Sequence, residues 1–246
     1  MKFKTFAFAA AASLLISGAA FAQDATPPAP APAPAAPAEP APPYTLAFNF
    51  GAATDYVFRG ISQTNNKFQG FAGADLTVGQ FYTGLWTSNV NFSPFGDDRS
   101  SNEIDIYGGW KPTMGNLTLD IGGIYYGYVH NPGNTNYGEV YGKGTYAFGP
   151  LTVGASLYWS PQFPAKGGSS WYYEGNAAYT IDKWSISGAL GHQDIKNAPD
   201  YTTWNLGVSY AILKNVSIDV RYWDTNAHDF GDVYDAKLVG TLKATF

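Results

Sequence analysis

The sequence has no cysteine, so disulfide bonds cannot hold its fold together. A chain of this length must instead be stabilised by the burial of apolar side chains or by a closed network of backbone hydrogen bonds. Charged residues are also scarce, at 13% of the sequence, and the formal net charge is −5. Because nucleic acid binding requires a basic face, this acidic balance predicts that nucleic acid is not a partner.

Long apolar runs are missing after residue 22, which excludes a membrane-spanning helix in the rest of the chain. Residues 1–22, MKFKTFAFAAAASLLISGAAFA, combine two lysines, an apolar stretch and a small-x-small cleavage site at Ala20-Phe21-Ala22. This combination is typical of a secretory signal peptide, which is removed from the mature protein. Removal of Lys2 and Lys4 leaves 12 basic against 19 acidic residues, a net charge of −7.

Residues 23–43 consist almost entirely of alanine and proline, as in the stretch PPAPAPAPAAPAEPAPP. Proline lacks a backbone N–H donor and fixes φ, so helix and sheet are both disfavoured there. We expect a semi-rigid, extended spacer in the periplasm. A proline-rich ligand for a partner domain is the alternative, which the missing basic anchor residue disfavours.

Aromatic residues and glycine are plentiful, in contrast to charged residues. The sequence has 16 Phe, 18 Tyr, 7 Trp and 28 Gly. Apolar and polar residues alternate with a period of two, most clearly over residues 117–122, 151–159 and 216–223, and helical spacing is nowhere as strong. A period of two predicts strands with one apolar and one polar face.

Twelve strands are predicted between residues 44 and 246, and the connections between them predict the topology. The strands cover residues 44–60, 67–79, 81–90, 102–111, 116–129, 137–148, 151–160, 170–180, 184–193, 201–212, 215–224 and 234–246. Tight turns alternate with longer loops that centre on Gln63, Pro94, Pro132, Pro164, Lys196 and Asp229. This alternation is typical of an all-β fold, a transmembrane antiparallel up-and-down sheet. Because lipid cannot satisfy open strand edges, the sheet must close into a β-barrel, here over residues 44–246.

Aromatic residues collect at both ends of the predicted strands, which favours a membrane barrel over a soluble β-sandwich, because amphipathic rings suit the headgroup level. The belt near the long loops contains Tyr56, Phe58, Trp159, Trp171, Tyr173, Trp204 and Tyr222. The belt near the tight turns contains Tyr44, Phe81, Trp110, Tyr146, Phe148, Tyr179, Trp184, Tyr210 and Phe246. A last strand that ends on an aromatic residue resembles the signal read by the barrel-assembly machinery, so this machinery is an expected partner through Phe246.

The same period of two places the charged residues of the strands on the lumen side. A charge facing lipid near the midplane would cost roughly 2–4 kcal/mol. The predicted lumen-facing set is Asp55, Arg59, Asp75, Asp105, Lys111, Asp120, Glu139, Lys143, Glu174, Asp219, Arg221, Lys237 and Lys243. Two roles stay open for each of these residues. They either pair across strands and fill the lumen, or they line a pore and set its ion selectivity.

The stretch DYVFRGISQT, residues 55–64, follows the alternating first strand. It resembles the N-terminal signature of the TorF family of porins, also called the Gcw_chp family of bacterial proteins. The resemblance extends from Tyr44 to Phe246 and implies a porin-like role in the outer membrane. It implies no particular solute and no catalytic residues.

The function that these patterns favour is a passive diffusion channel for small hydrophilic solutes in the outer membrane of a Gram-negative bacterium. Such a channel would contact outer-membrane lipid and lipopolysaccharide, and no cofactor is expected. A narrow or plugged barrel with a structural or adhesive role is the alternative. A barrel-type lipid hydrolase is less favoured, because His130, His192 and His228 lie in loops or at strand ends, outside any recognisable nucleophile motif. Acidic loops could attract divalent cations, but solvated loop charge is the favoured interpretation and no metal site is predicted.

Overall fold

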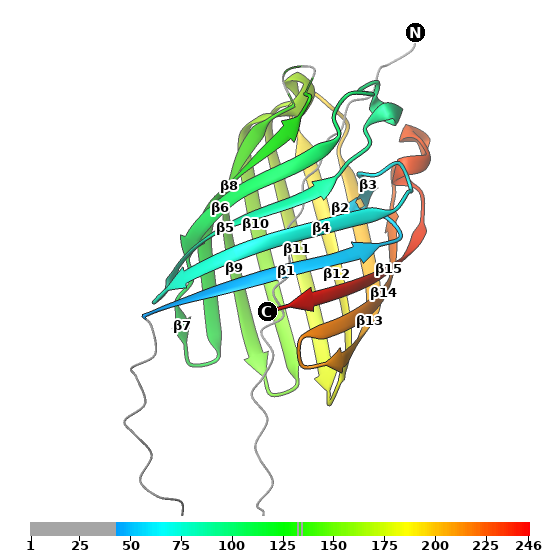
Figure 1. Ribbon diagram of the computed structural model, residues 1–246. Helices are drawn as coiled ribbons and strands as arrows, with labels where there is room; N and C mark the ends of the chain where they lie inside the picture. Colours follow the sequence, from blue (N-terminus) through cyan, green and yellow to red (C-terminus); the bar gives the residue numbers. More distant parts are fainter. Residues whose placement is uncertain (1–42, 132, 134) are drawn as a thin grey trace, which may run out of the picture.

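The computed structural model describes residues 43–131, 133 and 135–246 and shows a closed antiparallel β-barrel (Figure 1). The predicted signal peptide and the predicted spacer up to residue 42 lie outside the described residues. The wall consists of twelve long strands: β1 (Tyr44–Ala53), β4 (Gln69–Val78), β5 (Phe81–Asn89), β6 (Asn102–Trp110), β8 (Leu117–Val129), β9 (Tyr137–Phe148), β10 (Leu151–Phe163), β11 (Gly168–Ile181), β12 (Trp184–Ile195), β13 (Tyr201–Leu213), β14 (Val216–Thr225) and β15 (Lys237–Thr245).

Short elements occupy some of the connections. They are the strands β2 (Val57–Phe58), β3 (Ile61–Ser62) and β7 (Thr113–Met114), and the 3₁₀ helices η1 (Ser93–Phe95), η2 (Pro164–Lys166), η3 (His228–Phe230) and η4 (Asp232–Tyr234). Among the described residues, no helix is long and apolar enough to cross a membrane.

The barrel is closed by pairing of the first wall strand with the last. β1 pairs antiparallel with β15, so that Phe50 lies opposite Ala244, and every other wall strand pairs with its neighbours along the chain. At this seam the backbones of Phe48 and Phe246 exchange two hydrogen bonds of 2.8 Å. The rings of Phe50 and Phe246 stack at 5.6 Å. The predicted twelve-stranded up-and-down barrel is therefore confirmed, and its strand edges are satisfied within the wall.

Connections of two kinds distinguish the two ends of the barrel. Tight turns, such as Gly79-Gln80 and Gly149-Pro150, join strands at one end, which we call the turn end. Longer connections, such as residues 90–101 and 226–236, lie at the opposite end, which we call the loop end. β1 starts and β15 finishes at the turn end (Figure 1).

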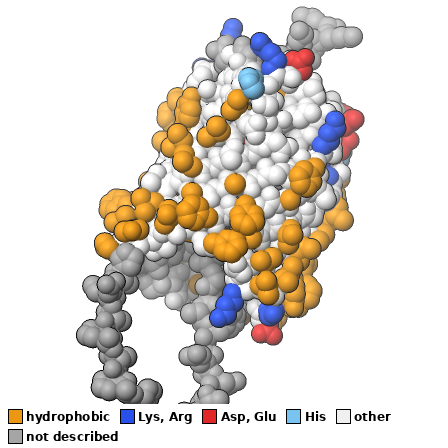
Figure 2. All heavy atoms as spheres, in the orientation of Figure 1, with side chains coloured by type: hydrophobic (Ala, Val, Ile, Leu, Met, Phe, Trp, Pro, Cys, Tyr) orange, Lys and Arg blue, Asp and Glu red, His pale blue; other side chains and the backbone are white. Residues whose placement is uncertain are grey.

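Side chains alternate between the lipid-facing wall and the lumen, as the period of two predicts. On β1, for example, Leu46, Phe48 and Phe50 are exposed on the outside, whereas Asn49 is buried inside. Exposed aromatic residues form a belt at each end, with Trp171 among those near the loop end. On the face shown in Figure 2, the charged side chains lie toward the two ends, and the wall between them is hydrophobic or uncharged.

One predicted strand is wrong in its second half. The pattern predicts a strand over residues 44–60 with Tyr56 and Phe58 on the lipid face, but β1 ends at Ala53 and both rings are buried in the lumen. Side chains alternate between the lipid face and the lumen only while the backbone stays in the sheet. After Ala53 the chain leaves the wall, so outward and inward no longer alternate. The last strand is also shorter than predicted, because Tyr234 belongs to η4 and β15 begins only at Lys237.

Candidate functional site

Residues 54–64, which we call the inward hairpin, fold into the lumen. Its strands β2 and β3 pair antiparallel, with Phe58 opposite Ile61. Arg59 and Gly60 form the two-residue connection, and both have positive φ, at 48° and 84°. Such a connection requires positive φ at both positions, which glycine adopts freely and which costs other residues about 1–3 kcal/mol. Arginine at this position is therefore expected to gain compensating contacts through its side chain.

Polar side chains at the base of the inward hairpin hold its two ends together. Oδ1 of Asp55 accepts hydrogen bonds from the hydroxyls of Ser62, at 2.6 Å, and Thr64, at 2.7 Å. The backbone N–H of Tyr56 donates to the Thr64 hydroxyl at 3.1 Å. Burial raises the pKa of Asp55 above its ordinary value, and the two hydroxyl bonds oppose this in part. Four polar or aromatic positions of DYVFRGISQT thus have local structural roles.

The inward hairpin crosses the lumen near the loop end. It starts at β1, and its tip reaches β10, which lies six strands from β1 in either direction around the barrel. Its aromatic rings pack against the wall, with Tyr56 edge-on to Trp86 at 5.4 Å and Phe58 edge-on to Tyr126 at 6.5 Å. The buried cluster that results contains Tyr56, Phe58, Ile61, Trp86, Val90, Phe92, Phe95, Tyr126, Tyr128, Tyr137, Phe163, Ile195, Tyr201, Ala227, Val233 and Tyr234.

Arg59 reaches across the lumen into a site made by the opposite wall. Its two Nη atoms bind the two carboxylate oxygens of Glu139, at 2.9 and 2.7 Å, and Nη1 also donates to Oε1 of Gln193 at 2.8 Å. The guanidinium carbon lies 4.9 Å from the ring centre of Tyr158 and 4.3 Å from that of Tyr172. The Arg59 and Glu139 side chains are only 4% and 1% exposed. We call Glu139, Gln193, Tyr158 and Tyr172 the arginine site.

The arginine site is fixed by further hydrogen bonds in the wall. Tyr126 donates to Oε2 of Glu139 at 3.1 Å, and Nε2 of Gln193 donates to the Trp171 carbonyl at 3.1 Å. Burial alone would lower the pKa of the Arg59 guanidinium, but the paired Glu139 carboxylate raises it above its ordinary value. Arg59 is therefore charged at every relevant pH, and its charge is matched by a carboxylate held in place.

The turn-end half of the lumen has a different lining, made of half-buried polar and charged side chains. Lys143 lies 3.8 Å from Asp120, and Arg221 pairs with Asp219 at 3.0 Å. Tyrosine hydroxyls bind other carboxylates: Tyr107 donates to Asp75 at 2.6 Å. We call this set, with Tyr82, Glu174 and Lys243, the polar lining. Its acids and bases are mostly paired, so no strong field of one sign is expected.

The structure separates the thirteen predicted lumen-facing residues into two groups. The buried residues at the loop end are Asp55, Arg59, Asp105 and Glu139, and the half-buried ones are Asp75, Lys111, Asp120, Lys143, Glu174, Asp219, Arg221, Lys237 and Lys243. Asp55 and Arg59 differ from the prediction because they belong to the inward hairpin and not to a wall strand. Lys111 follows the end of β6 at the turn end, and Lys237 donates to the Val233 carbonyl in the last loop.

Several residues of the site are absent from the predicted set. Three of them, Gln193, Tyr158 and Tyr172, are uncharged. The prediction considers only charged residues at lumen-facing strand positions, so it does not include them. Glu103 is fully buried and accepts a 2.9 Å hydrogen bond from the Tyr56 hydroxyl. It shares inward parity with Asp105, so the period of two could have identified it.

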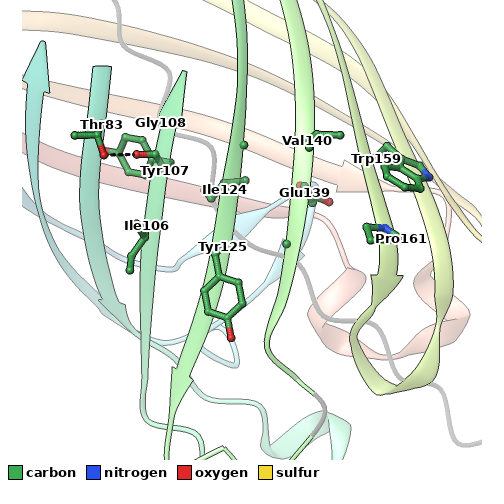
Figure 3. A pocket seen from close by; sticks show the side chains of 12 residues that line it. Thr83, Ile106, Tyr107, Gly108, Ile124, Tyr125, Glu139, Val140, Trp159 and Pro161 are labelled. Carbon is green, nitrogen blue, oxygen red and sulfur yellow. Dashed lines mark hydrogen bonds between the residues drawn. The ribbon is translucent and has the colours of Figure 1, made fainter. Parts of the chain in front are cut away.

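A shallow hollow lies on the lipid-facing wall, behind Glu139 (Figure 3). Its sides are exposed side chains of neighbouring strands, including Ile106, Tyr125 and Val140. Its floor contains Gly108 and other outward-facing glycines, which leave the backbone uncovered. The hollow belongs to the lipid-facing surface of the barrel, and Glu139 is among the residues that line it.

The acidic residues and histidines of the loop end contact polar neighbours. Nδ1 of His130 lies 3.2 Å from the Ser101 hydroxyl, and Nδ1 of His192 lies 2.9 Å from the Thr202 hydroxyl. In the last loop His228 lies 2.7 Å from the Asp224 carboxylate, and Asp97 accepts hydrogen bonds from Ser100 within its own turn. No group of three or more His, Cys, Asp or Glu side chains among the described residues is arranged to hold a metal ion.

Comparisons with known proteins agree with the fold. The family model described as "Bacterial protein of unknown function (Gcw_chp)" matches residues 37–246. A search of curated proteins finds no match. Among solved structures, the KdgM porin has a TM-score of 0.59 at 12% identity, covering 81% of this chain and 99% of that chain. The KdgM porin in complex with disordered oligogalacturonate has 0.57 at 12%, covering 81% and 98%. The NanC porin has 0.52 at 9%, covering 82% and 98%. At these identities the likeness is one of fold.

Proposed function

The chain belongs to the Gcw_chp family. From the side chains that line its lumen, we propose that it is an outer-membrane channel for small hydrophilic solutes, with the inward hairpin as its constriction. The observation that carries this proposal is the contrast between the two surfaces of the wall. The outside is apolar with two aromatic belts, whereas the inside holds half-buried charges of both signs. A polar lining of this kind is expected in a barrel that water enters.

The proposed location is the outer membrane of a Gram-negative bacterium, with the loop end outside the cell. The signal-peptide pattern and the porin-like barrel support this location. A protease-cleavable tag inserted near Asn197, in a loop, should be cut on intact cells, and one inserted at Lys214, in a tight turn, should be protected. Cleavage of the Lys214 tag on intact cells would contradict this orientation.

Selectivity should be weak, because the polar lining contains nearly equal numbers of acids and bases. Arg221 is bound by Asp219 and by Oδ1 of Asn205 at 2.6 Å. Arg221→Ala would leave the carboxylate unpaired and should shift the reversal potential toward cation selectivity. The oligogalacturonate in the KdgM structure is an acidic sugar chain. We do not expect acidic solutes to be favoured here, because the basic side chains at Lys143 and Arg221 already have acidic partners.

The experiment that tests the proposal is reconstitution of the refolded protein in planar bilayers. We expect discrete single-channel steps and a reversal potential near zero under a salt gradient. Arg221→Ala should move that potential in the cation direction, and high salt should shrink the difference by screening. Steps with the same potential in both proteins would mean that the polar lining does not border the conducting path.

A plugged barrel with a structural role is the second candidate, because the inward hairpin crosses the lumen and buries aromatic rings against the opposite wall. The two candidate functions differ in whether the inward hairpin can move out of the lumen. Liposomes that contain the protein should swell in small sugars if it is a channel, and should not swell if the hairpin is permanently seated. The channel is favoured because the polar lining presents half-buried charges to the lumen.

A further inference from the structure

The hydrogen-bonding partners of Arg59 all come from the wall, and this is the basis of a further inference. Of the described rings that contact the guanidinium, only that of Phe58, at 4.6 Å, belongs to the inward hairpin. Glu139, Gln193, Tyr158 and Tyr172 lie on four adjacent strands, β9 to β12, whereas Arg59 comes from a loop. We propose that the arginine site is a guanidinium-binding site of the channel, which Arg59 fills as an internal ligand. A solute that carries a guanidinium group binds there when the inward hairpin withdraws. Its entry from solution rests on the proposed channel function.

The chemistry of the arginine site selects a planar cation with several donors. The Glu139 carboxylate takes two parallel N–H bonds, and Gln193 supplies a third acceptor. Two tyrosine rings lie within 5 Å of the guanidinium carbon, a distance at which a cation is attracted to a ring face. An ammonium group lacks the fork that matches a carboxylate in two places. Urea has the planar shape but not the charge.

Contacts within the wall itself help to hold this site in shape. The four strands are joined by continuous antiparallel ladders, and Tyr126 and the Trp171 carbonyl orient Glu139 and Gln193. Tyr172 lies close against Gly191, where any larger residue would meet the ring. A site fixed by the wall can receive a second ligand with the same geometry, because little must be reorganised when Arg59 leaves.

An empty arginine site is disfavoured, which links ligand entry to hairpin movement. Withdrawal of Arg59 leaves the buried Glu139 carboxylate without its cation, and an unpaired buried charge is costly. A guanidinium-bearing solute removes that cost by replacing Arg59. Lys143, half-buried and 5.5 Å from the ring of Tyr158, places the polar lining next to the site on the turn-end side. A solute that reaches the polar lining is therefore separated from the arginine site only by the ring of Tyr158.

The test is chemical rescue of Arg59→Ala by guanidinium. We expect millimolar guanidinium chloride to raise the unfolding temperature of refolded Arg59→Ala and to block its current, whereas urea and methylammonium chloride at the same concentration do neither. Arg59→Ala/Glu139→Gln should require at least about tenfold more guanidinium. The wild type should also respond only at higher concentration, because Arg59 competes for the site. Equal guanidinium responses in the single and double variants would overturn the proposal, as would an equal response to urea.

Two further readouts keep the outcomes separate. If Arg59→Ala inserts without conducting, the channel function is contradicted, and the shift in unfolding temperature still tests the site. If it conducts but guanidinium changes neither current nor unfolding temperature, the site is contradicted and the channel stands. If Arg59→Ala does not refold, Arg59→Lys keeps the charge without the fork, and the same comparison with its Glu139→Gln double variant decides.

Discussion

Removal of the Glu139 charge should release the inward hairpin without unfolding the barrel. Glu139→Gln leaves the buried Arg59 guanidinium with Gln193 and the two rings of the arginine site but without a carboxylate. Loss of one partner of a buried ion pair costs about 3–5 kcal/mol. The remaining contacts favour the lower end, so we expect about 3 kcal/mol.

This cost falls on the hairpin, because the wall has its own hydrogen-bonded ladders. A change of about 3 kcal/mol corresponds to a rise of roughly a hundredfold in the ratio of released to seated hairpin. Hydrogen exchange of the β2 and β3 amides, followed by mass spectrometry of a peptide that covers residues 54–64, measures this ratio directly. Exchange in the wall strands should be unchanged.

The matched control is Asp219→Asn, which removes another carboxylate from the lumen but from a pair that the inward hairpin does not touch. It should leave exchange in residues 54–64 at the wild-type rate. Replacement of both partners, Arg59→Met with Glu139→Leu, should be milder than Glu139→Gln, because no buried charge is left unpaired. The reasoning is refuted if Glu139→Gln and Asp219→Asn give the same exchange in the hairpin.

Two other predictions concern a close packing contact and a titrating loop. Gly191→Ala should displace the Tyr172 ring and weaken seating of the hairpin by about 1–3 kcal/mol. Gly175→Ala should have no such effect, because a methyl group at Gly175 would extend into open space. Hydrogen exchange of the hairpin amides compares the two variants. His228 should titrate above its ordinary pKa because it donates a hydrogen bond to the Asp224 carboxylate, so its contribution to loop docking is full at low pH and lost as pH rises through the raised pKa. An NMR titration should show the His228 pKa falling in Asp224→Asn, and an unchanged value would contradict this.

The barrel itself is predictable from sequence because its physics is local and periodic. Alternation along stretches such as residues 151–159 fixes which side chains face lipid, and lipid then requires closure. Turns with glycine, such as Gly79-Gln80 and Gly149-Pro150, mark the ends of strands. These signals lie within a few residues of the feature they predict.

The inward hairpin is harder to predict because its decisive contacts are distant in sequence. The alternating pattern, extended past Ala53, places Phe58 on the lipid face. Arg59-Gly60 is not one of the Asn-Gly, Asp-Gly or Gly-Gly pairs that mark a two-residue turn, so the turn has no strong local signal. The partner of Arg59 is Glu139, 80 residues away, and Gln193 is 134 residues away. Nothing local in the sequence links these positions, so only the assembled barrel shows which acid the arginine binds.

The single-channel conductance of a protein without the inward hairpin tests the central claim most directly. The variant replaces residues 55–64 by a short glycine-serine linker between Thr54 and Asn65, and wild type and variant are recorded in the same bilayers and salt. If the hairpin is the constriction of a channel, the variant should show larger and more continuous openings than the wild type. Equal conductance in the two proteins, with the variant inserted and heat-modifiable on gels, would contradict the account.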